Sequence, residues 1–159
     1  MEELVLRQMT NAEFAGYRAW VISERAEVKA SAGDWDADEA LELASVEVDK
    51  LLPAGVDTPG MLLLTAQAPG GETLGMVWIG FDRPDPRSTA WIYYIKMEPK
   101  YRRKGYGGAL LRHAEELAVR RGARTVGLNV FWSNTVARGL YGSSGYKIIS
   151  MLMRKALLM

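Results

Sequence analysis

A short basic stretch rich in glycine is the first place where residue types and spacing suggest chemistry. Residues 101–108 read YRRKGYGG, and three cations precede three glycines: Arg102, Arg103, Lys104, Gly105, Gly107 and Gly108. The residues that follow have helical apolar spacing, and a helix N-terminus presents unpartnered N–H groups and a partial positive charge. Glycines let an anion approach that backbone, and the cations supply counter-charge. The stretch predicts a phosphate site, whereas a basic surface turn that caps a helix is the alternative.

A second stretch, LNVFWSNTVARGLYGSSGY at residues 128–146, combines an amide and a phenol on one helix face. We expect a short helix with Ser133 as its N-cap. Asn134 and Tyr141 are seven positions apart, which places them on the same face with ~10 Å between them. An amide can hydrogen-bond other amides, and a phenol with a pKa of about 10 can protonate a leaving group. The alternative for Tyr141 is a core tyrosine with a satisfied hydroxyl.

Two common phosphate-binding motifs do not fit the glycine stretch. A P-loop needs GxxxxGK[ST], and a dinucleotide fingerprint needs GxGxxG with a later acidic residue. The order R-R-K-G-Y-G instead resembles the pyrophosphate loop of the GNAT superfamily of N-acetyltransferases, [QR]xxGx[GA], at Arg102, Gly105 and Gly107. The second stretch matches the same family at Asn134, Ala137, Leu140, Tyr141, Gly145 and Tyr146.

This resemblance implies an acetyl-CoA-dependent N-acetyltransferase that acts on a primary amine, either a small molecule or a protein amine. It implies that the backbone of Met97 pairs with pantetheine, and that the six loop residues bind the pyrophosphate. Asn134 would hydrogen-bond the pantetheine amides, and Tyr141 would be the general acid for the CoA thiolate. Since the chain has no cysteine for an acyl-enzyme, we expect direct attack in a ternary complex.

The strand before the loop departs from the family pattern. Relatives commonly carry a carboxylate there, but this chain has Tyr94 and Lys96 at those positions, and Glu98 lies toward the pyrophosphate. The general base is therefore unassigned. Two other functions stay open: an acyl-CoA-binding regulatory domain with little or no transferase activity, and a nucleic-acid-binding module that uses the basic loop. The shortness of the patch and the net charge of +1 argue against nucleic acid.

The elements that must position these residues can be read from apolar periodicity and turn signals. We expect helices at 10–30, 36–52, 105–121 and 133–142, and strands at 3–9, 61–67, 73–81, 89–97, 123–131 and 146–154. This order describes a single α/β domain, residues 1–159, with a mixed sheet covered by helices. The resemblance further implies a mostly antiparallel, twisted sheet flanked by helices, the GNAT-like acyl-CoA N-acyltransferase fold.

Composition narrows the chemistry and the location. The 159 residues are 48% hydrophobic and 25% charged, which is ordinary for a globular protein. With no cysteine and one histidine, at position 113, we expect no disulfide and no metal site. Neither a signal sequence nor a membrane-spanning run of ~20 apolar residues is recognisable, so we expect a cytoplasmic protein that does not enter a membrane.

Charge and hydropathy patterns suggest two further partners. Residues 1–52 carry 5 Lys+Arg against 12 Asp+Glu, and residues 53–159 carry 15 against 7. Trp20, Glu24 and Glu27 share one helix face that could receive a cationic amine, although solvated carboxylates explain it as well. The final stretch, residues 146–154, is apolar on both sides of the expected strand, which suggests a homodimer through the C-terminal segment.

Overall fold

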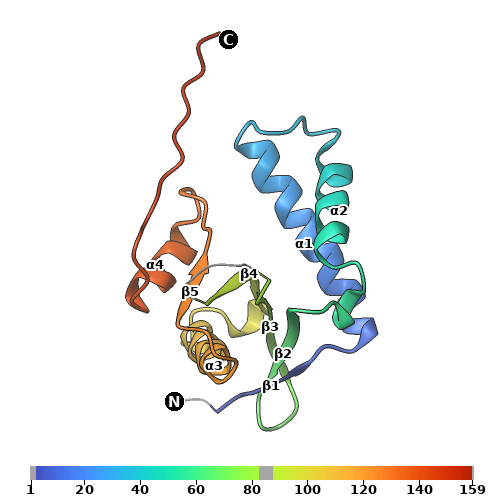
Figure 1. The fold of residues 1–159 in the computed structure, drawn as a ribbon, viewed down its shortest axis with the longest axis vertical. Helices are drawn as coiled ribbons and strands as arrows, with labels where there is room; N and C mark the ends of the chain where they lie inside the picture. The colour runs from blue at the N-terminus through green and yellow to red at the C-terminus, as the bar shows by residue number, and fades with distance from the viewer. Residues whose placement is uncertain (1–2, 83–87, 159) are drawn as a thin grey trace. The chain divides into compact units, whose positions relative to one another are not determined.

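The computed structural model describes residues 3–82 and 88–158, and the chain divides into two compact units, 1–129 and 130–159. In the described residues the first unit contains a five-stranded sheet and three α-helices, and the second contains one α-helix and an extended segment (Figure 1). The α-helices are α1 (Asn11–Ser31), α2 (Ala40–Leu51), α3 (Tyr106–Arg120) and α4 (Thr135–Ser143). The strands are β1 (Val5–Gln8), β2 (Met61–Gln67), β3 (Thr73–Gly80), β4 (Thr89–Met97) and β5 (Thr125–Leu128). Short 3-10 turns are η1 (Gly55–Asp57) and η2 (Pro99–Tyr101). A single domain over residues 1–159 stays a prediction.

The sheet has the strand order β1-β2-β3-β4-β5. The first three pairings are antiparallel, and β4 pairs with β5 in parallel. A parallel pair needs a crossover connection, which α3 supplies between β4 and β5. The predicted α/β class with a mixed, mostly antiparallel sheet is confirmed.

Helices cover both faces of the sheet in the first unit (Figure 1). Helices α1 and α2 pack together on one face, where Tyr17, Val48 and Trp78 belong to one buried cluster. Helix α3 contacts β3 and β4 and buries Leu110 and Leu111 completely. Successive residues of a strand point to opposite faces of the sheet, and consecutive residues of β2 and β3 are buried. Both faces of these two strands are therefore covered, which explains their nearly continuous apolar sequence.

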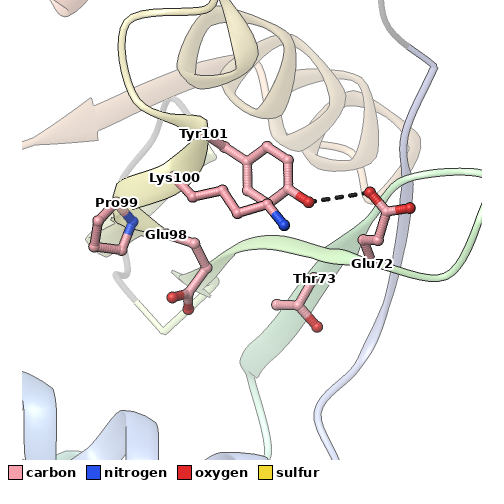
Figure 2. A pocket seen from close by; sticks show the side chains of 6 residues that line it. All are labelled: Glu72, Thr73, Glu98, Pro99, Lys100 and Tyr101. Atoms are coloured by element: carbon pink, nitrogen blue, oxygen red, sulfur yellow. Dashed lines mark hydrogen bonds between the residues drawn. The ribbon is translucent and has the colours of Figure 1, made fainter.

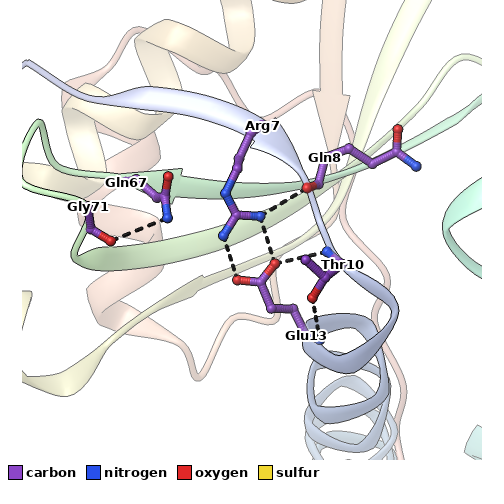
Figure 3. Close-up of polar contacts among 6 residues, drawn as sticks. All are labelled: Arg7, Gln8, Thr10, Glu13, Gln67 and Gly71. Atoms are coloured by element: carbon purple, nitrogen blue, oxygen red, sulfur yellow. Dashed lines mark hydrogen bonds and ion pairs between the residues drawn. The ribbon is translucent and has the colours of Figure 1, made fainter.

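Helix α1 begins with the capping box that the sequence predicts. The Thr10 hydroxyl accepts from the Glu13 backbone N–H at 3.1 Å, and the Glu13 carboxylate accepts from the Thr10 N–H at 2.9 Å (Figure 3). Arg7, on β1, adds two hydrogen bonds of 2.8 Å to the same carboxylate. The Arg7 guanidinium, together with the capping bonds, lowers the pKa of Glu13 to about 2. The contacts among Arg7, Thr10 and Glu13 therefore tie β1 to the start of α1.

Helix α2 begins later than expected. It begins at Ala40 rather than Asp36, because residues 36–39 form a turn closed by a hydrogen bond from the Glu39 N–H to the Asp36 carbonyl at 3.1 Å. Leu41, in the first turn of α2, is 61% exposed. The described chain contains no helix that is both long enough and apolar enough to span a bilayer.

The predicted last strand, residues 146–154, is wrong. Residues 146–158 form no strand, although β5 ends the sheet with one side not paired to any described strand. A strand exists only as part of a hydrogen-bonded ladder, and the described residues of the second unit contain no strand with which residues 146–158 could pair. The strand propensity of this segment is therefore not enough to form the element alone.

Candidate active site

The site is centred on the place where β4 and β5 separate. The two strands pair from Thr89–Thr125 to Ile92–Leu128, and β4 then continues to Met97. Within the described residues, the side of β4 that faced β5 has no strand partner over positions 93–97. Backbone groups on such an edge can hydrogen-bond an extended ligand that carries amides, much as they would a further strand.

A β-bulge lies at this separation. Trp78 pairs with Tyr94 while Ile79 pairs with Ile92, so Tyr93 is an extra residue in β4. The Tyr93 ring stacks on Trp78 with centroids 4.4 Å apart, and the Tyr17 hydroxyl donates to the Tyr94 carbonyl at 2.9 Å. Sequence reasoning missed the bulge because β4 has no glycine or proline to signal it. These contacts hold the strand in shape where it leaves its parallel neighbour.

The structure brings together two of the predicted site residues, Met97 and Arg102. Strand β4 ends at Met97, and η2 leads to Arg102, whose Nε donates to the Met97 carbonyl at 3.2 Å. This bond joins the expected pantetheine strand to the first cation of the loop. No sequence pattern predicts this bond, because the contact depends on how η2 turns the chain back.

The glycine loop has the backbone that its sequence predicts. Gly105 is the N-cap of α3 and has φ of +85°, in the left-handed region where glycine carries no Cβ penalty. Arg103 also has positive φ, at 62°, and it is exposed together with Arg102 and Lys104. The first turn of α3 holds Gly107 and Gly108 but no acidic residue, and its backbone N–H groups have no partner within the helix. Exposed cations at a helix N-terminus of this kind fit a pyrophosphate.

A pocket of about 440 Å³ lies beside the chain that leads into the loop (Figure 2). It is lined by Glu72, Thr73, Glu98, Pro99, Lys100 and Tyr101. The Tyr101 hydroxyl donates to the Glu72 carboxylate at 3.0 Å, and the Tyr101 ring meets Tyr106 edge-on with centroids 5.5 Å apart. These contacts anchor η2 to the start of β3 and to α3, so the segment before the glycine loop is fixed on both sides.

Tyr94 and Lys96, which stand where relatives carry a carboxylate, both interact with other side chains. Burial raises the pKa of the Tyr94 phenol, and the Arg25 cation beside it acts in the opposite direction. The Lys96 ammonium lies 5.7 Å from the centre of the Trp20 ring and 3.8 Å from the Glu98 carboxylate. The general base therefore stays unassigned.

The predicted acceptor face on α1 and the predicted absence of a metal site are both untested. The Lys96 ammonium of the same chain already lies over the Trp20 ring. Glu24 is half-buried and Glu27 is exposed. A cationic acceptor on this face stays a hypothesis. Among the residues described, no three His, Asp or Glu side chains gather as a metal site would require.

The second unit holds the other two predicted site residues. Asn134, rather than the expected Ser133, caps α4: its Oδ1 accepts from the Ala137 N–H at 3.1 Å, and Ser133 lies one residue outside the helix. This bond leaves the Asn134 amide NH₂ able to donate. Burial raises the pKa of Tyr141, whose ring meets Tyr146 edge-on with centroids 5.7 Å apart. That Asn134 and Tyr141 share one site with the loop stays a prediction.

Comparison with known proteins identifies related chains of similar length. A sequence model of the acetyltransferase (GNAT) family matches residues 27–146. The uncharacterized N-acetyltransferase YycN of Bacillus subtilis is 31% identical over 97% of this chain and 99% of its own length. Its crystal structure matches 99% of this chain and 100% of that chain with a TM-score of 0.93. A second B. subtilis protein, the uncharacterized N-acetyltransferase YdgE, is 30% identical over 96% of this chain and 97% of its own length.

A more distant structure shares the fold. The aminoglycoside N-acetyltransferase AAC(6')-Iy in complex with CoA is 14% identical and has a TM-score of 0.63, over 98% of this chain and 95% of that chain.

Proposed function

This chain belongs to the acetyltransferase (GNAT) family and is an acyltransferase, and from this premise we propose that it transfers an acetyl group from acetyl-CoA to a primary amine. The observation that carries the proposal is the Gly105 loop. Three exposed cations precede a left-handed glycine at the N-terminus of α3, directly after the strand whose edge is open. A phosphate-rich carrier with an amide-containing arm suits both features at once.

In this proposal the loop and the open strand divide the work of binding acetyl-CoA. Arg102, Arg103 and Lys104 neutralise the pyrophosphate, which hydrogen-bonds the N–H groups of the first turn of α3. The pantetheine arm lies along β4 and pairs with the backbone at Met97. Arg102 therefore gives up or shares its bond to the Met97 carbonyl when the co-substrate binds. Asn134 donates its amide NH₂ to the same arm.

The chemical step is a direct attack by the acceptor amine. The amine nitrogen forms a bond to the thioester carbonyl carbon, the carbon–sulfur bond breaks, and its electron pair leaves on sulfur. Tyr141 protonates that thiolate, and the nitrogen loses its proton to solvent. Backbone N–H groups on the open edge of β4 polarise the carbonyl oxygen. The raised pKa of Tyr141 keeps the phenol protonated at neutral pH, as a general acid requires.

The acceptor is an amine, and we place the reaction in the cytoplasm. AAC(6')-Iy is a transferase for aminoglycosides, which are amines, and the likeness to it supports this chemical class without selecting one compound. Variable segments build the acceptor site in such scaffolds, so small amines and protein amines both belong in a screen.

Two measurements test the proposal. Acetyl-CoA, CoA and dephospho-CoA should each raise the melting temperature, because at one hundred times Kd a ligand adds about 2.7 kcal/mol of stability. Release of free thiol should then identify the acceptor among amines and peptides. No thermal shift at millimolar CoA would contradict the proposal. A shift without turnover on any amine would favour the regulatory domain, and salt-dependent DNA binding in place of CoA binding would favour the nucleic-acid module.

A further inference from the structure

Residues 93–97 of β4, all of them described, include no side chain that can take a proton from an acceptor amine. An alkyl amine has a pKa of about 10.4, so at neutral pH its nitrogen is an ammonium without a free electron pair. Burial raises the pKa of Tyr94 and keeps its phenol protonated. Lys96 is itself a cation and lies 5.7 Å from the centre of the Trp20 ring. The Tyr93 hydroxyl is already a donor, to the Asp82 carboxylate at 2.9 Å.

The Asp82 carboxylate lies away from the open edge of β4. A Cβ on Gly80 would be 2.5 Å from the Asp82 Oδ1 and 2.6 Å from the Tyr93 ring, so both groups lie over Gly80 of β3. In the sheet β3 flanks β4 on one side, and the open edge is on the other, where β5 has separated. A carboxylate at that edge has to come from another element.

Helix α1 brings a carboxylate to this edge. The Tyr17 hydroxyl donates to the Tyr94 carbonyl at 2.9 Å, which fixes the face of α1 that meets β4. Glu24 follows Tyr17 by seven positions, so it stands on the same helix face two turns farther along. Trp20, one turn before Glu24, meets the Tyr94 ring edge-on with centroids 6.2 Å apart. Glu24 therefore continues a row of side chains that already contacts β4 where its edge is open.

The charges around Tyr94 place Glu24 near its phenol. Burial raises the pKa of Tyr94, Arg25 acts in the opposite direction, and the Glu47 and Glu24 carboxylates add to the rise. The Arg25 Nε donates to the Glu47 carboxylate at 2.8 Å, so that pair is matched. Glu24 is half-buried, and no ion pair joins it to another side chain in residues 3–82 and 88–158. A half-buried carboxylate without a counter-ion favours a cationic ligand.

We propose that Glu24 binds the acceptor as an ammonium at the open edge of β4 and accepts its proton. This inference rests on the amine acetylation proposed above. One N–H bond of the ammonium breaks, its electron pair stays on nitrogen, and the proton passes to the Glu24 carboxylate and from there to solvent. The nitrogen pair then forms the bond to the thioester carbon, the sulfur leaves and is protonated as described, and the second N–H proton goes to solvent. The acceptor class that fits is an alkyl amine, which is cationic at neutral pH.

Glu24→Gln keeps the size of the side chain and removes the base. It should lower kcat/KM for an alkyl amine by about 100-fold at pH 7 and leave the acetyl-CoA Kd unchanged. Glu24→Asp should recover part of the activity. The matched control is Glu116→Gln, which removes the same charge from an exposed position of α3, on the other face of the sheet, and should behave as wild type. Wild-type kcat/KM in Glu24→Gln, or an equal loss in Glu116→Gln, would overturn the proposal.

The pH dependence separates proton transfer from a structural role. The loss in Glu24→Gln should shrink as the pH rises from 7 to 10, because the amine then forms its neutral state without a base. The charged and titratable groups that face Glu24 are Arg25 on α1, Glu47 on α2, and Tyr94 and Lys96 on β4. Both proteins contain all four, so their titration cancels in the ratio of kcat/KM values. A ratio that stays constant over this range would show that Glu24 takes no proton.

A carbon NMR titration tests the ammonium site without turnover. The protein carries carboxyl-labelled glutamate, and the Glu24 signal is the one that Glu24→Gln lacks. It should shift when n-butylammonium chloride is added, but not with sodium chloride at the same ionic strength, and the Glu116 signal should stay in place. An unresponsive Glu24 signal would overturn this inference whether or not the protein is active. A Glu24 shift in a protein that acetylates no amine would support the ammonium site and contradict the proposed function.

Discussion

Helices α1 and α4 differ in length and in how many of their side chains are buried. Helix α1 has 21 residues, buries four side chains and is tied to α2 by ion pairs of 2.9 Å (Arg18–Asp49) and 2.8 Å (Arg25–Glu47). Helix α4 has nine residues and no fully buried side chain. A helix that short is marginal on its own, so α4 needs contacts outside itself to stay folded. Ligand-binding elements are drawn from the less stable parts of a fold, so the light packing of α4 is compatible with the role proposed for Asn134 and Tyr141.

The largest effect is expected at the glycine loop. Gly107→Glu places a negative charge in the first turn of α3, where the pyrophosphate binds, and should weaken acetyl-CoA binding by about 1,000-fold or abolish it. Gly107→Ala is the matched control, since it adds a methyl group without charge, and it should lose less affinity. Calorimetry gives both constants. If Gly107→Glu keeps both its melting temperature and its affinity for acetyl-CoA, the phosphate site does not lie at this loop.

Tyr141→Phe should lower kcat by about 100-fold and leave acetyl-CoA affinity nearly unchanged. The phenol acts only as the thiolate leaves, and general-acid contributions run at about 10²–10⁴-fold. Tyr146→Phe, at the neighbouring ring, is the control and should keep most of the activity. The loss should shrink with acyl donors whose thiol is more acidic. Equal kcat for Tyr141→Phe and wild type would remove Tyr141 from the mechanism.

The pH profile gives a second test of Tyr141. A raised folded pKa means that the acid form persists above pH 10. The midpoint of any loss of activity through this group should therefore lie above pH 10, and Tyr141→Phe should lack that alkaline limb. Steady-state kinetics from pH 6 to pH 10.5 provides the profile, and a limb near neutral pH that disappears in Tyr141→Phe would contradict the direction of the shift.

Much of the scaffold follows from local rules, whereas the site depends on contacts between distant segments. Thr10 and Glu13 predict the start of α1 because a capping box involves residues three apart, and the bounds of β2 and β4 follow from apolar runs between turns. Arg102 and Gly105 were identifiable because a helix N-terminus with glycines is a local anion site. The fold class follows from the order of such elements.

The rest requires tertiary information. The Tyr93 bulge is set by Trp78 and Tyr17, which are distant in sequence, and the Arg102–Met97 bond depends on the turn at η2. Residues 36–39 carry helix-compatible side chains but form a turn. The C-terminal strand was predicted from an alternating apolar pattern, but strand formation needs a hydrogen-bonded partner that the pattern does not name.

A smaller effect is expected at the start of α1, the more extensively packed of the two helices. Glu13→Gln removes the ion pair with Arg7 and should lower the free energy of unfolding at pH 7 by no more than about 1 kcal/mol, because the pair is partly exposed and screened by solvent. The folded pKa of Glu13 is about 2, below its usual 4.5, so this stability is complete above pH 4.5 and is lost as the pH falls toward 2. Urea unfolding at pH 7, 4.5 and 2.5 measures it. Glu27→Gln, at an exposed position of the same helix, should change little, and a Glu13→Gln difference that is constant with pH would contradict the ion pair.

The smallest effect compares two helix glycines directly. Gly16 on α1 and Gly139 on α4 both have open space where a Cβ would be placed. Replacing either with alanine should stabilise its own helix by about 0.5–1 kcal/mol. Gly16→Ala should raise the global unfolding midpoint, because α1 is part of the core. Gly139→Ala should leave that midpoint unchanged and slow hydrogen exchange of the α4 amides by about two- to fivefold, because α4 opens without the core. If Gly139→Ala raises the midpoint as much as Gly16→Ala, the two helices unfold together. That outcome would contradict the idea that α4 opens separately from the core and needs a bound ligand to hold it.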